Sequence, residues 1–257
     1  MKFATWNVNS VRQRESHIRL WLEREQPDAL LLQEIKCEAP AFPAAAFASV
    51  GYQAVIVGQK SYNGVAILTR EKPEIVHTAL PGLPPEPQAR YVEIRLQGLT
   101  LGNLYLPNGN SGGEAGYQAK LDWMDALGDH AHALLAAETD FVLAGDYNVC
   151  PADEDYASGA VSTDDALVRP ETRNRFRRLL WLGLTDAVRA RQPTGPVYTF
   201  WDYQAGCWPR DRGLRIDHAL LSPRLAERLV SAVPDRQQRD AQQPSDHVPL
   251  TVELAAS

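Results

Sequence analysis

The sequence predicts an α/β fold in which two mixed, largely antiparallel β-sheets pack face to face between outer helices, a four-layer α/β sandwich. More than ten short segments are rich in apolar and β-branched residues, and this number would overfill one twisted sheet. Three other segments carry apolar residues at helical spacing. A chain of 257 residues can bury a large core, so we expect residues 1–257 to form a single domain.

The first elements follow from apolar runs and turn residues. Lys2–Trp6 is a predicted strand, and a helix capped by Ser10 or Ser16 is expected to run through residues 17–22. Asp28–Glu34 is a short apolar run, consistent with a strand that is buried on both faces. Three further short strands are predicted at Tyr52–Gly58, Gly64–Thr69 and Ile75–Thr78.

The later elements begin with a predicted antiparallel hairpin. Arg90–Leu96 alternates with period two, and Leu99–Leu106 follows after a turn at Gly98. Leucines at helical spacing predict a helix over Tyr117–Ala137. The remaining elements are a helix over Thr172–Leu182 and strands over Phe141–Ala144, Val197–Trp201, Leu214–Leu221, Leu229–Val233 and Val248–Leu254.

Short polar motifs stand at or beside six of the predicted strand ends. They are Thr5–Asn9, Leu32–Glu34, Leu104–Gly109, Gly145–Asn148, Leu214–His218 and Ser245–His247. Any one of them could be a turn, but six together are hard to explain as turns. A strand fixes the side chain at its end and the adjoining loop leaves it accessible, which is where sheet-based enzymes place their chemistry.

The residue types in these motifs favour a hard cation and phosphoryl transfer. The candidate oxygen ligands are Glu34, Asp146, Asp217, Asp246, Asn7 and Asn148. Carboxylate and amide oxygens suit Mg²⁺ or Mn²⁺, whereas zinc prefers Cys and His. A hard cation beside His247 can neutralise charge on a phosphate while a base activates water. Taken alone, each residue has a structural alternative, such as a pairing of Asp217 with an arginine or a surface position for His247.

The net charge of −6 is unevenly distributed. Arg169–Arg215 contains ten arginines, four acidic residues and no lysine, so it carries +6 and the remainder carries −12. A positive region beside acidic metal ligands suits a protein that binds phosphates. A solvated helical face in an arginine-rich chain is the alternative, and for the cluster Arg173–Arg178 the two interpretations remain open.

The cysteines and the hydropathy pattern bear on localisation. Cys37, Cys150 and Cys207 form no C-x-x-C pair, which argues against a disulfide framework or a structural zinc site. Neither an apolar run of about 18 residues nor a signal-peptide pattern is present in the sequence. We therefore expect a soluble, cytoplasmic protein with no membrane partner.

Taken together, the motifs resemble the exonuclease III branch of the exonuclease–endonuclease–phosphatase superfamily, the bacterial apurinic/apyrimidinic (AP) endonucleases. The resemblance covers essentially the whole chain through W-N-V-N-S, L-L-Q-E-x-K, Y-N-G-V-A-I-L, Y-L-P-N-G, G-D-Y-N, L-G-L-T-D-A, Y-T-F-W-D-Y, G-L-R-I-D-H and P-S-D-H-x-P. The segment Thr199–His218 is typical of the DNA-repair branch. The resemblance implies a monomeric, Mg²⁺- or Mn²⁺-dependent hydrolase that cleaves double-stranded DNA 5′ to abasic sites, with 3′→5′ exonuclease activity and removal of blocked 3′ ends.

The resemblance also implies a metal site. Glu34 would be the principal ligand, with Asn7 and Asp246 beside it. Asp146, Asn148 and His247 are the alternative ligands. Whether one or two metal ions act is left open by the ligand types.

The resemblance further implies the catalytic roles. Asp146 would align or deprotonate the attacking water, and Tyr105 would contact the scissile phosphate or share in proton transfer. Asn108 and Asn148 would donate to the phosphate oxygens. His247 would donate to a non-bridging oxygen, with its ring held by Asp217, because an Asp–His pair fixes tautomer and orientation.

Substrate binding is carried over in the same way. Phe200 and Leu214 match positions that wall the pocket for a flipped abasic sugar, whose small apolar face an aromatic and an aliphatic side chain can accept. Trp208 would either probe the duplex or anchor its loop. Arg90 and Arg215 complete the expected DNA-binding set.

The segment from Pro151 to Pro170 departs from the family pattern. Asp153–Asp155 and Asp164–Asp165 make it acidic, which leaves open how DNA is held there and how strong the exonuclease activity is.

Two alternatives remain. A hydrolase acting on lipid or inositol headgroups would share the metal site. A nucleic-acid-binding protein without catalysis would be free to lose Glu34, Asp146, Asn148 or His247, which are all present.

Overall fold

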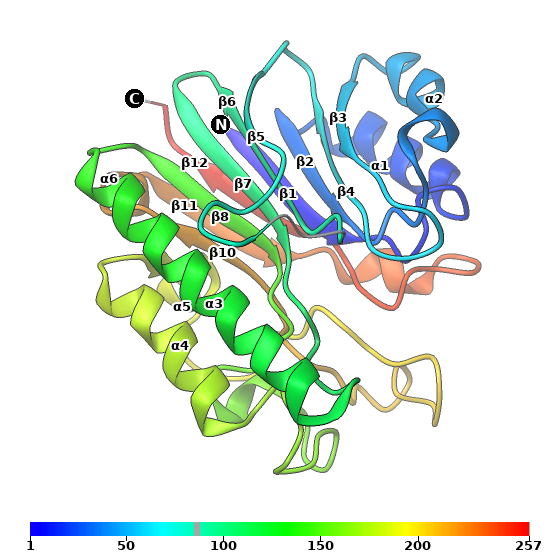
Figure 1. The fold of residues 1–257 in the computed structure, drawn as a ribbon. Coiled ribbons are helices and arrows are strands. Elements are labelled where there is room, and N and C mark those ends of the chain that lie inside the picture. Colours follow the sequence, from blue (N-terminus) through cyan, green and yellow to red (C-terminus); the bar gives the residue numbers. More distant parts are fainter. Residues whose placement is uncertain (85–87, 257) are drawn as a thin grey trace.

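Two mixed six-stranded sheets pack face to face in the described residues, 1–84 and 88–256, of the computed structural model (Figure 1). In spatial order, the first sheet contains β11 (Leu229–Pro234), β12 (Leu250–Leu254), β1 (Lys2–Asn7), β2 (Ala29–Gln33), β4 (Val65–Thr69) and β3 (Gln53–Val57). The second contains β5 (Glu74–His77), β6 (Tyr91–Leu96), β7 (Leu99–Tyr105), β8 (Phe141–Asp146), β10 (Asp217–Leu221) and β9 (Thr185–Asp186).

Helices cover the outer faces of both sheets, which confirms the predicted four-layer α/β sandwich (Figure 1). The first sheet is covered by α1 (Glu15–Glu25) and α2 (Ala44–Ala48), and the second by α3 (Gly113–Ala136) and α4 (Pro170–Trp181). The short helices are α5 (Ala187–Arg191), α6 (Pro223–Glu227) and the 3₁₀ turns Ala39–Ala41, Asp153–Asp155 and Arg236–Asp240. Among the described residues, no helix is long and apolar enough to cross a membrane.

Strand β2 shows why the sequence forms these layers. Its alternate side chains point to opposite faces, so Leu31 enters the core between the sheets while Leu30 and Leu32 pack beneath α1 with Trp21. All five residues of the strand are buried, as the continuous apolar run predicts. Full burial of one such leucine contributes roughly 1.5–3 kcal/mol, so this strand needs a layer on each side.

A buried polar contact joins the two sheets close to their functional edge. The Nε2 of Gln33, the last residue of β2, donates to Oδ1 of Asn103 on β7 at 2.7 Å. The Asn103 amide in turn donates to the main-chain oxygens of Leu32 and Ala66, both at 2.9 Å. These buried hydrogen bonds favour one packing, because a shifted register would leave the Gln33 and Asn103 donors unpaired. This contact therefore fixes one sheet against the other beside the polar strand ends.

Strand direction collects the polar motifs at one edge of the sandwich. The parallel pairs β1–β2 and β7–β8 bring the ends of four strands together, with Tyr105 opposite Asp146. Because β10 runs antiparallel to β8, its first residue, Asp217, lies opposite Asp146. Likewise β12 runs antiparallel to β1, so His247 comes just before the strand that pairs with the end of β1.

Two predicted strands differ from the structure. Val197–Trp201 is an irregular segment, in which both Thr199 and Phe200 donate to the main-chain oxygen of Leu214. On its other side Thr199 accepts from Val248, so the segment makes isolated bridges to two neighbours instead of a ladder. The predicted strand over Leu214–Leu221 begins only at Asp217 for the same reason.

One finer prediction was wrong and another was confirmed. Helix α1 begins after Arg14, with neither Ser10 nor Ser16 at its cap. The alternation in β6 correctly predicts an antiparallel pair with β7, and on its polar side Arg95 is exposed while Glu93 is only 1% exposed. Glu93 accepts hydrogen bonds from Tyr91 Oη at 2.5 Å and pairs with His130 Nε2 at 2.6 Å. A buried carboxylate with two partners thus mimics the pattern of an exposed residue.

Candidate active site

A cavity of about 560 Å³ opens at the edge where β1, β2, β7 and β8 end. Its lining includes most of the predicted site residues, namely Glu34, Tyr105, Asn108, Asp146, Asn148, Phe200, Leu214, Asp246 and His247. Asn7 and Asp217 lie beneath it and are fully buried. Residues that are as much as 240 positions apart in the sequence therefore meet in one place.

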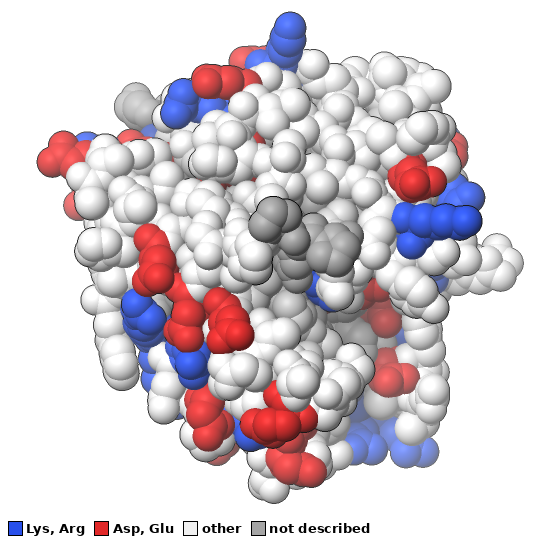
Figure 2. All heavy atoms as spheres, viewed as in Figure 1, with Lys and Arg blue, Asp and Glu red and all other residues white. Residues whose placement is uncertain are grey.

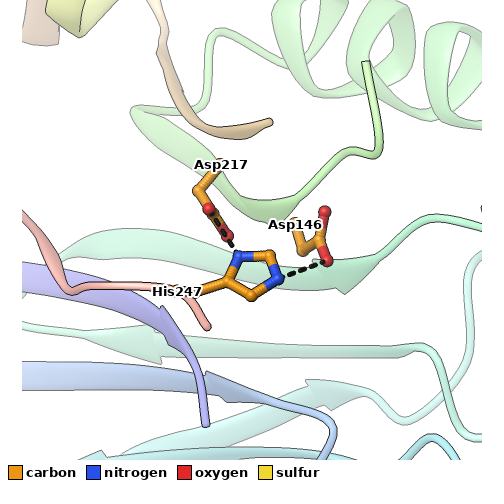
Figure 3. Close-up of side chains that lie close together, drawn as sticks. All are labelled: Asp146, Asp217 and His247. Carbon is orange, nitrogen blue, oxygen red and sulfur yellow. Dashed lines mark hydrogen bonds and ion pairs between the residues drawn. The ribbon is translucent and has the colours of Figure 1, made fainter. Parts of the chain in front are cut away.

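At the floor of the cavity, His247 lies between two aspartates (Figure 3). Its Nδ1 pairs with Oδ2 of Asp217 at 2.8 Å, and its Nε2 is 3.8 Å from Oδ2 of Asp146. The ring packs against Phe200, with centroids 4.9 Å apart. The orientation of the imidazole is therefore fixed by the hydrogen bond to a carboxylate and by packing against an aromatic ring.

The charges in this group shift one another. Burial alone would lower the pKa of His247, but the charge and hydrogen bond of Asp217 outweigh it and raise that pKa to about 10. Burial raises the pKa of Asp146 to about 7 against the opposing charge of His247, and the charge of Asp217 adds to the increase. At neutral pH the imidazole is therefore a cation, and Asp146 holds a proton more readily than an exposed aspartate does.

Glu34 sits at the end of β2 with a left-handed backbone, φ +50°. Burial would raise the pKa of Glu34, but the charge of Lys36 and the hydrogen bond from Asn7 lower it. Lys36 Nζ is 2.9 Å from Oε2 of Glu34. A non-glycine residue held at positive φ is strained and persists only where its surroundings fix it. The structure thus holds an ionised carboxylate directly after the end of β2.

Asn7 connects two carboxylates through its amide nitrogen. Its Nδ2 donates to Oε1 of Glu34 at 2.8 Å and to Oδ2 of Asp146 at 3.0 Å. Its Oδ1 accepts from the main-chain nitrogen of Asn9 at 3.1 Å. In this orientation Asn7 donates to the two acids, while its Oδ1 accepts one hydrogen bond and has a second acceptor position. The assignment of Asn7 as a metal ligand stays a prediction.

Two groups of residues could hold a cation. Asp146, Asp217 and His247 offer ligand atoms within 4.8 Å of one another. Their contacts, however, are those of a hydrogen-bonded Asp–His pair, and an imidazolium has no free lone pair for a metal. Glu34 and Asp246 line the same cavity, and their carboxylate oxygens are the donors that Mg²⁺ or Mn²⁺ prefers. The chemistry of the donors therefore favours Glu34 and Asp246.

Two amides and a phenol stand at the ends of β7 and β8. Asn108 Nδ2 donates to Oδ1 of Asn148 at 3.1 Å, and Asn148 Nδ2 donates to the main-chain oxygen of Leu106 at 2.9 Å. Burial and the charges of Glu34 and Asp146 raise the pKa of Tyr105, so its hydroxyl stays protonated. The Arg90 guanidinium lies over the Tyr105 ring, 4.7 Å from its centroid. Tyr105 is thus equipped to donate a hydrogen bond, which speaks against its use as a base.

Phe200 and Leu214 form an apolar part of the cavity wall. They pair across an isolated antiparallel bridge, and both line the cavity. Trp208 lies outside this lining and is held by its neighbours. Its Nε1 donates to Oδ1 of Asp240 at 2.9 Å, and its ring packs edge-on against Trp201 at 4.8 Å. These contacts favour the interpretation of Trp208 as an anchor of its own loop.

The prediction that Arg215 contacts DNA is not supported by the structure. Arg215 is only 1% exposed, and its guanidinium donates to Asp155 at 2.7 and 3.1 Å and to Asp186 at 2.7 Å. Arg189 also donates to Asp155, at 2.5 Å. Two acidic side chains thus neutralise the buried cation, and Arg215 joins the loop after β8 to β9.

Several other arginines of the stretch are also paired with acids. Arg173 binds Asp153 of the acidic loop, and Arg175 and Arg178 bind Asp125 of α3. Figure 2 shows acidic and basic side chains interspersed over α3 and α4 rather than one continuous basic patch. For these arginines the structure favours the structural interpretation over phosphate binding.

Sequence reasoning missed one buried cation beside the site, Lys120 of α3. The signal was present, because Lys120 occupies the apolar stripe of the helix, three residues after Tyr117 and four before Met124. Ser245 was quoted within a motif but given no role. Its Oγ donates to the main-chain oxygen of Asn7 at 2.7 Å and so ties the His247 loop to β1.

The whole chain is similar to known nucleases. Residues 4–247 match the model of the Endonuclease/Exonuclease/phosphatase family. The chain is 33% identical to exodeoxyribonuclease III of Haemophilus influenzae, over 99% of this chain and 100% of the relative. Two solved structures match over 100% of both chains: a 3′ phosphatase from Neisseria bound to product DNA hairpin, at 38% identity and a TM-score of 0.95, and an AP endonuclease from Archaeoglobus fulgidus, at 35% and 0.94.

These similarities agree with the geometry of the cavity, where a carboxylate set, an Asp–His pair and two amides meet at one sheet edge. The chain therefore belongs to the Endonuclease/Exonuclease/phosphatase family, within the branch of exodeoxyribonuclease III and the AP endonucleases.

Proposed function

We propose that this chain hydrolyses the phosphodiester bond 5′ to abasic sites in double-stranded DNA, in a reaction that depends on Mg²⁺ or Mn²⁺. One observation carries the proposal. A single cavity holds ionisable carboxylates, an oriented imidazolium, two amide donors and an apolar wall. Each part has a use in cleaving a phosphodiester beside a sugar that lacks its base.

The cation would be held by Glu34 and Asp246. Bound there, it would neutralise negative charge on the phosphate. The donor set fits because both side chains are carboxylates that line the cavity, and the pKa of Glu34 is lowered so that it is ionised at neutral pH.

The remaining chemistry falls to the protein itself. Asp146 takes the proton of the attacking water, and its pKa of about 7 suits a base that works near neutral pH. The His247 imidazolium donates from Nε2 to a non-bridging phosphate oxygen, while Asp217 holds Nδ1. Asn108 and Asn148 each use one amide hydrogen within the protein, which leaves each a second one for the phosphate.

Substrate selection rests on the wall formed by Phe200 and Leu214. An abasic sugar presents a small apolar face, which this wall accepts, whereas a nucleotide with its base needs more room. Double-stranded DNA as the partner is supported by the DNA hairpin bound to the Neisseria relative.

The test compares three duplexes: one with a single abasic-site analogue, one undamaged, and one with a nick that carries a 3′-phosphate. Each is incubated with Mg²⁺ and with EDTA. The proposal expects cleavage 5′ to the abasic analogue that EDTA abolishes and that Asp146→Asn loses. Cleavage that survives EDTA, or no cleavage with any divalent cation, would overturn it.

The nicked duplex addresses a second activity, removal of 3′-blocking groups in the same cavity. Its support is the full-length similarity to a 3′ phosphatase at 38% identity. Rapid phosphate release with slow abasic cleavage would make 3′-end processing the principal activity. Equal rates would show that one site serves both.

A further inference from the structure

The buried Lys120 has no role in the proposed mechanism so far, although it lies directly under the site. It is fully buried on the inner face of α3, and lysine is almost never fully buried unless its ammonium group is paired. The question is therefore what its Nζ binds.

Lys120 Nζ binds the main chain of the two amide residues of the site. It donates to the carbonyl oxygen of Asn148 at 2.6 Å and to that of Asn108 at 3.0 Å. Asn148 has a left-handed φ of +49°, so its carbonyl does not continue the ladder of β8. A buried carbonyl without a partner is costly, and Lys120 satisfies that of Asn148 while it also binds the partly buried carbonyl of Asn108.

The loop that carries Asn108 rests on the stem of the same lysine. A Cβ added to Gly109 would lie 2.7 Å from Cδ of Lys120 and 3.1 Å from Cβ of Ala166. Gly109 also has φ +87°, which favours glycine. The main chain of Gly109 therefore lies directly against the aliphatic part of the Lys120 side chain, with no room for a side chain at position 109.

We propose that Lys120 is a positioning residue that holds the main chains of Asn108 and Asn148 together, so that their side-chain amides face one phosphate. The side chains already contact each other through Asn108 Nδ2 and Asn148 Oδ1. Because the two residues follow different strands, β7 and β8, a tie beneath both loops fixes their separation. The inference rests on the proposed function and deepens it, since it concerns the same reaction.

The two hydrogen bonds from Lys120 do not depend on the charge of the lysine. Burial lowers the pKa of Lys120 to about 7, against the attraction of Asp146 and Asp165. An ammonium has three N–H donors and a neutral amine has two, so both forms can serve both carbonyls. Lys120 therefore acts through its donors.

The first test is kinetic, with Lys120→Met, which keeps the stem and removes the donors. The matched control is His130→Gln, a buried polar residue on the same helix that contacts Glu93 instead of the site. On the abasic duplex with Mg²⁺, Lys120→Met is expected to lower kcat by about 10–100-fold and leave KM within about threefold, because small misplacement of a catalytic group costs up to about 10²-fold. His130→Gln is expected to lower the melting temperature without a matching loss of kcat.

A second variant perturbs the same contact from the other side. Gly109→Ala pushes the loop off the lysine stem and leaves the donors intact, so it should lower kcat in the same way. It also keeps the inference testable if Lys120→Met does not fold. Wild-type kcat in a folded Lys120→Met protein, or losses in Lys120→Met and His130→Gln that simply follow their melting temperatures, would overturn the inference.

The third measurement needs no activity. In the ¹⁵N-labelled full chain without DNA, Lys120→Met should shift the side-chain amide signals of Asn108 and Asn148. The signal of Asn103, which is buried between the sheets, should stay in place and serves as the reference. Unchanged Asn108 and Asn148 signals would refute the positioning role. A wild-type protein without nuclease activity would refute the proposed function, and the amide signals would still show whether Lys120 holds the two residues.

Discussion

The floor and the wall of the candidate active-site cavity are built in different ways. The floor consists of residues at strand ends, such as Glu34, Asp146 and Asp217, whose positions follow from strand register. The wall consists of irregular segments around residues 151–168 and 197–216, which carry Phe200 and Leu214. The floor is suited to fixing the chemistry, and the wall is suited to shaping the substrate pocket.

The two regions also differ in what stabilises them. Ladder hydrogen bonds and a buried amide bridge between Gln33 and Asn103 hold the floor. Buried ion pairs from Arg215 and Arg189 to Asp155 hold the wall. A ladder distributes stability over many bonds, whereas an ion pair concentrates it in a few atoms. Substitutions should therefore separate catalysis from wall stability.

The largest effect is expected at the floor, from His247→Ala. Loss of a positioned donor should lower kcat by about 10²–10⁴-fold with little loss of binding. Asp217→Asn should cost a smaller factor, because an amide can hold the ring but cannot stabilise its charge. In a double-mutant cycle the double variant should be little worse than His247→Ala. Strictly multiplicative losses would show that the two residues act independently.

The largest effect at the wall is expected from Arg215→Met. Removing one partner of a buried ion pair typically destabilises a protein by about 3–5 kcal/mol, because Asp155 and Asp186 remain buried. Urea unfolding should show this loss, while kcat of the folded fraction falls much less than in His247→Ala. A tenfold or greater fall in kcat at unchanged stability would make Arg215 part of the chemistry.

Glu34→Ala tests whether the floor holds the cation. The loss of a residue that contacts only a metal ligand costs ~10–100-fold in metal affinity or activity. Loss of a direct ligand should raise the Mg²⁺ concentration for half-maximal activity by more than that. Excess metal should partly rescue turnover. The measurement is a metal titration of activity. An unchanged titration midpoint would remove Glu34 from the metal site.

The pH profile tests the coupled charges of the floor. The proposed mechanism requires ionised Asp146 and protonated His247, so kcat/KM should rise through about pH 7 and fall through about pH 10. Asp217 raises the pKa of His247, so Asp217→Asn should move the alkaline limb to lower pH. An alkaline limb that stays in place would mean that another group controls it.

The smallest effect is expected from neutralising Arg175 and Arg178 on α4. Their pairs with Asp125 are partly exposed, so each should contribute at most about 1 kcal/mol to stability. The slope of log K for DNA binding against log salt should not change, because these guanidinium groups are already paired. A slope that flattens by about one unit per residue would return them to the DNA interface.

Many features of the floor were predictable from the sequence. Short apolar runs that end in carboxylate, amide and histidine motifs specify a sheet edge with phosphoryl-transfer chemistry, because strand periodicity and side-chain chemistry are local properties. The structure confirms that Glu34, Asp146, Asn148 and His247 line one cavity. The sandwich itself followed from the number of strands, which one twisted sheet could not hold.

Only the tertiary structure decided which polar residues bind other parts of the protein and are therefore structural. Arg215 turns inward to Asp155, Trp208 binds Asp240 at the surface, the amide nitrogen of Asn7 faces two acids, and Lys120 lies beneath two loops. Each of these partners is distant in sequence or reached through irregular backbone, so no local pattern predicts the pairing. A buried polar side chain takes whichever partner the packing brings to it, because leaving it unpaired costs more than almost any single contact gains.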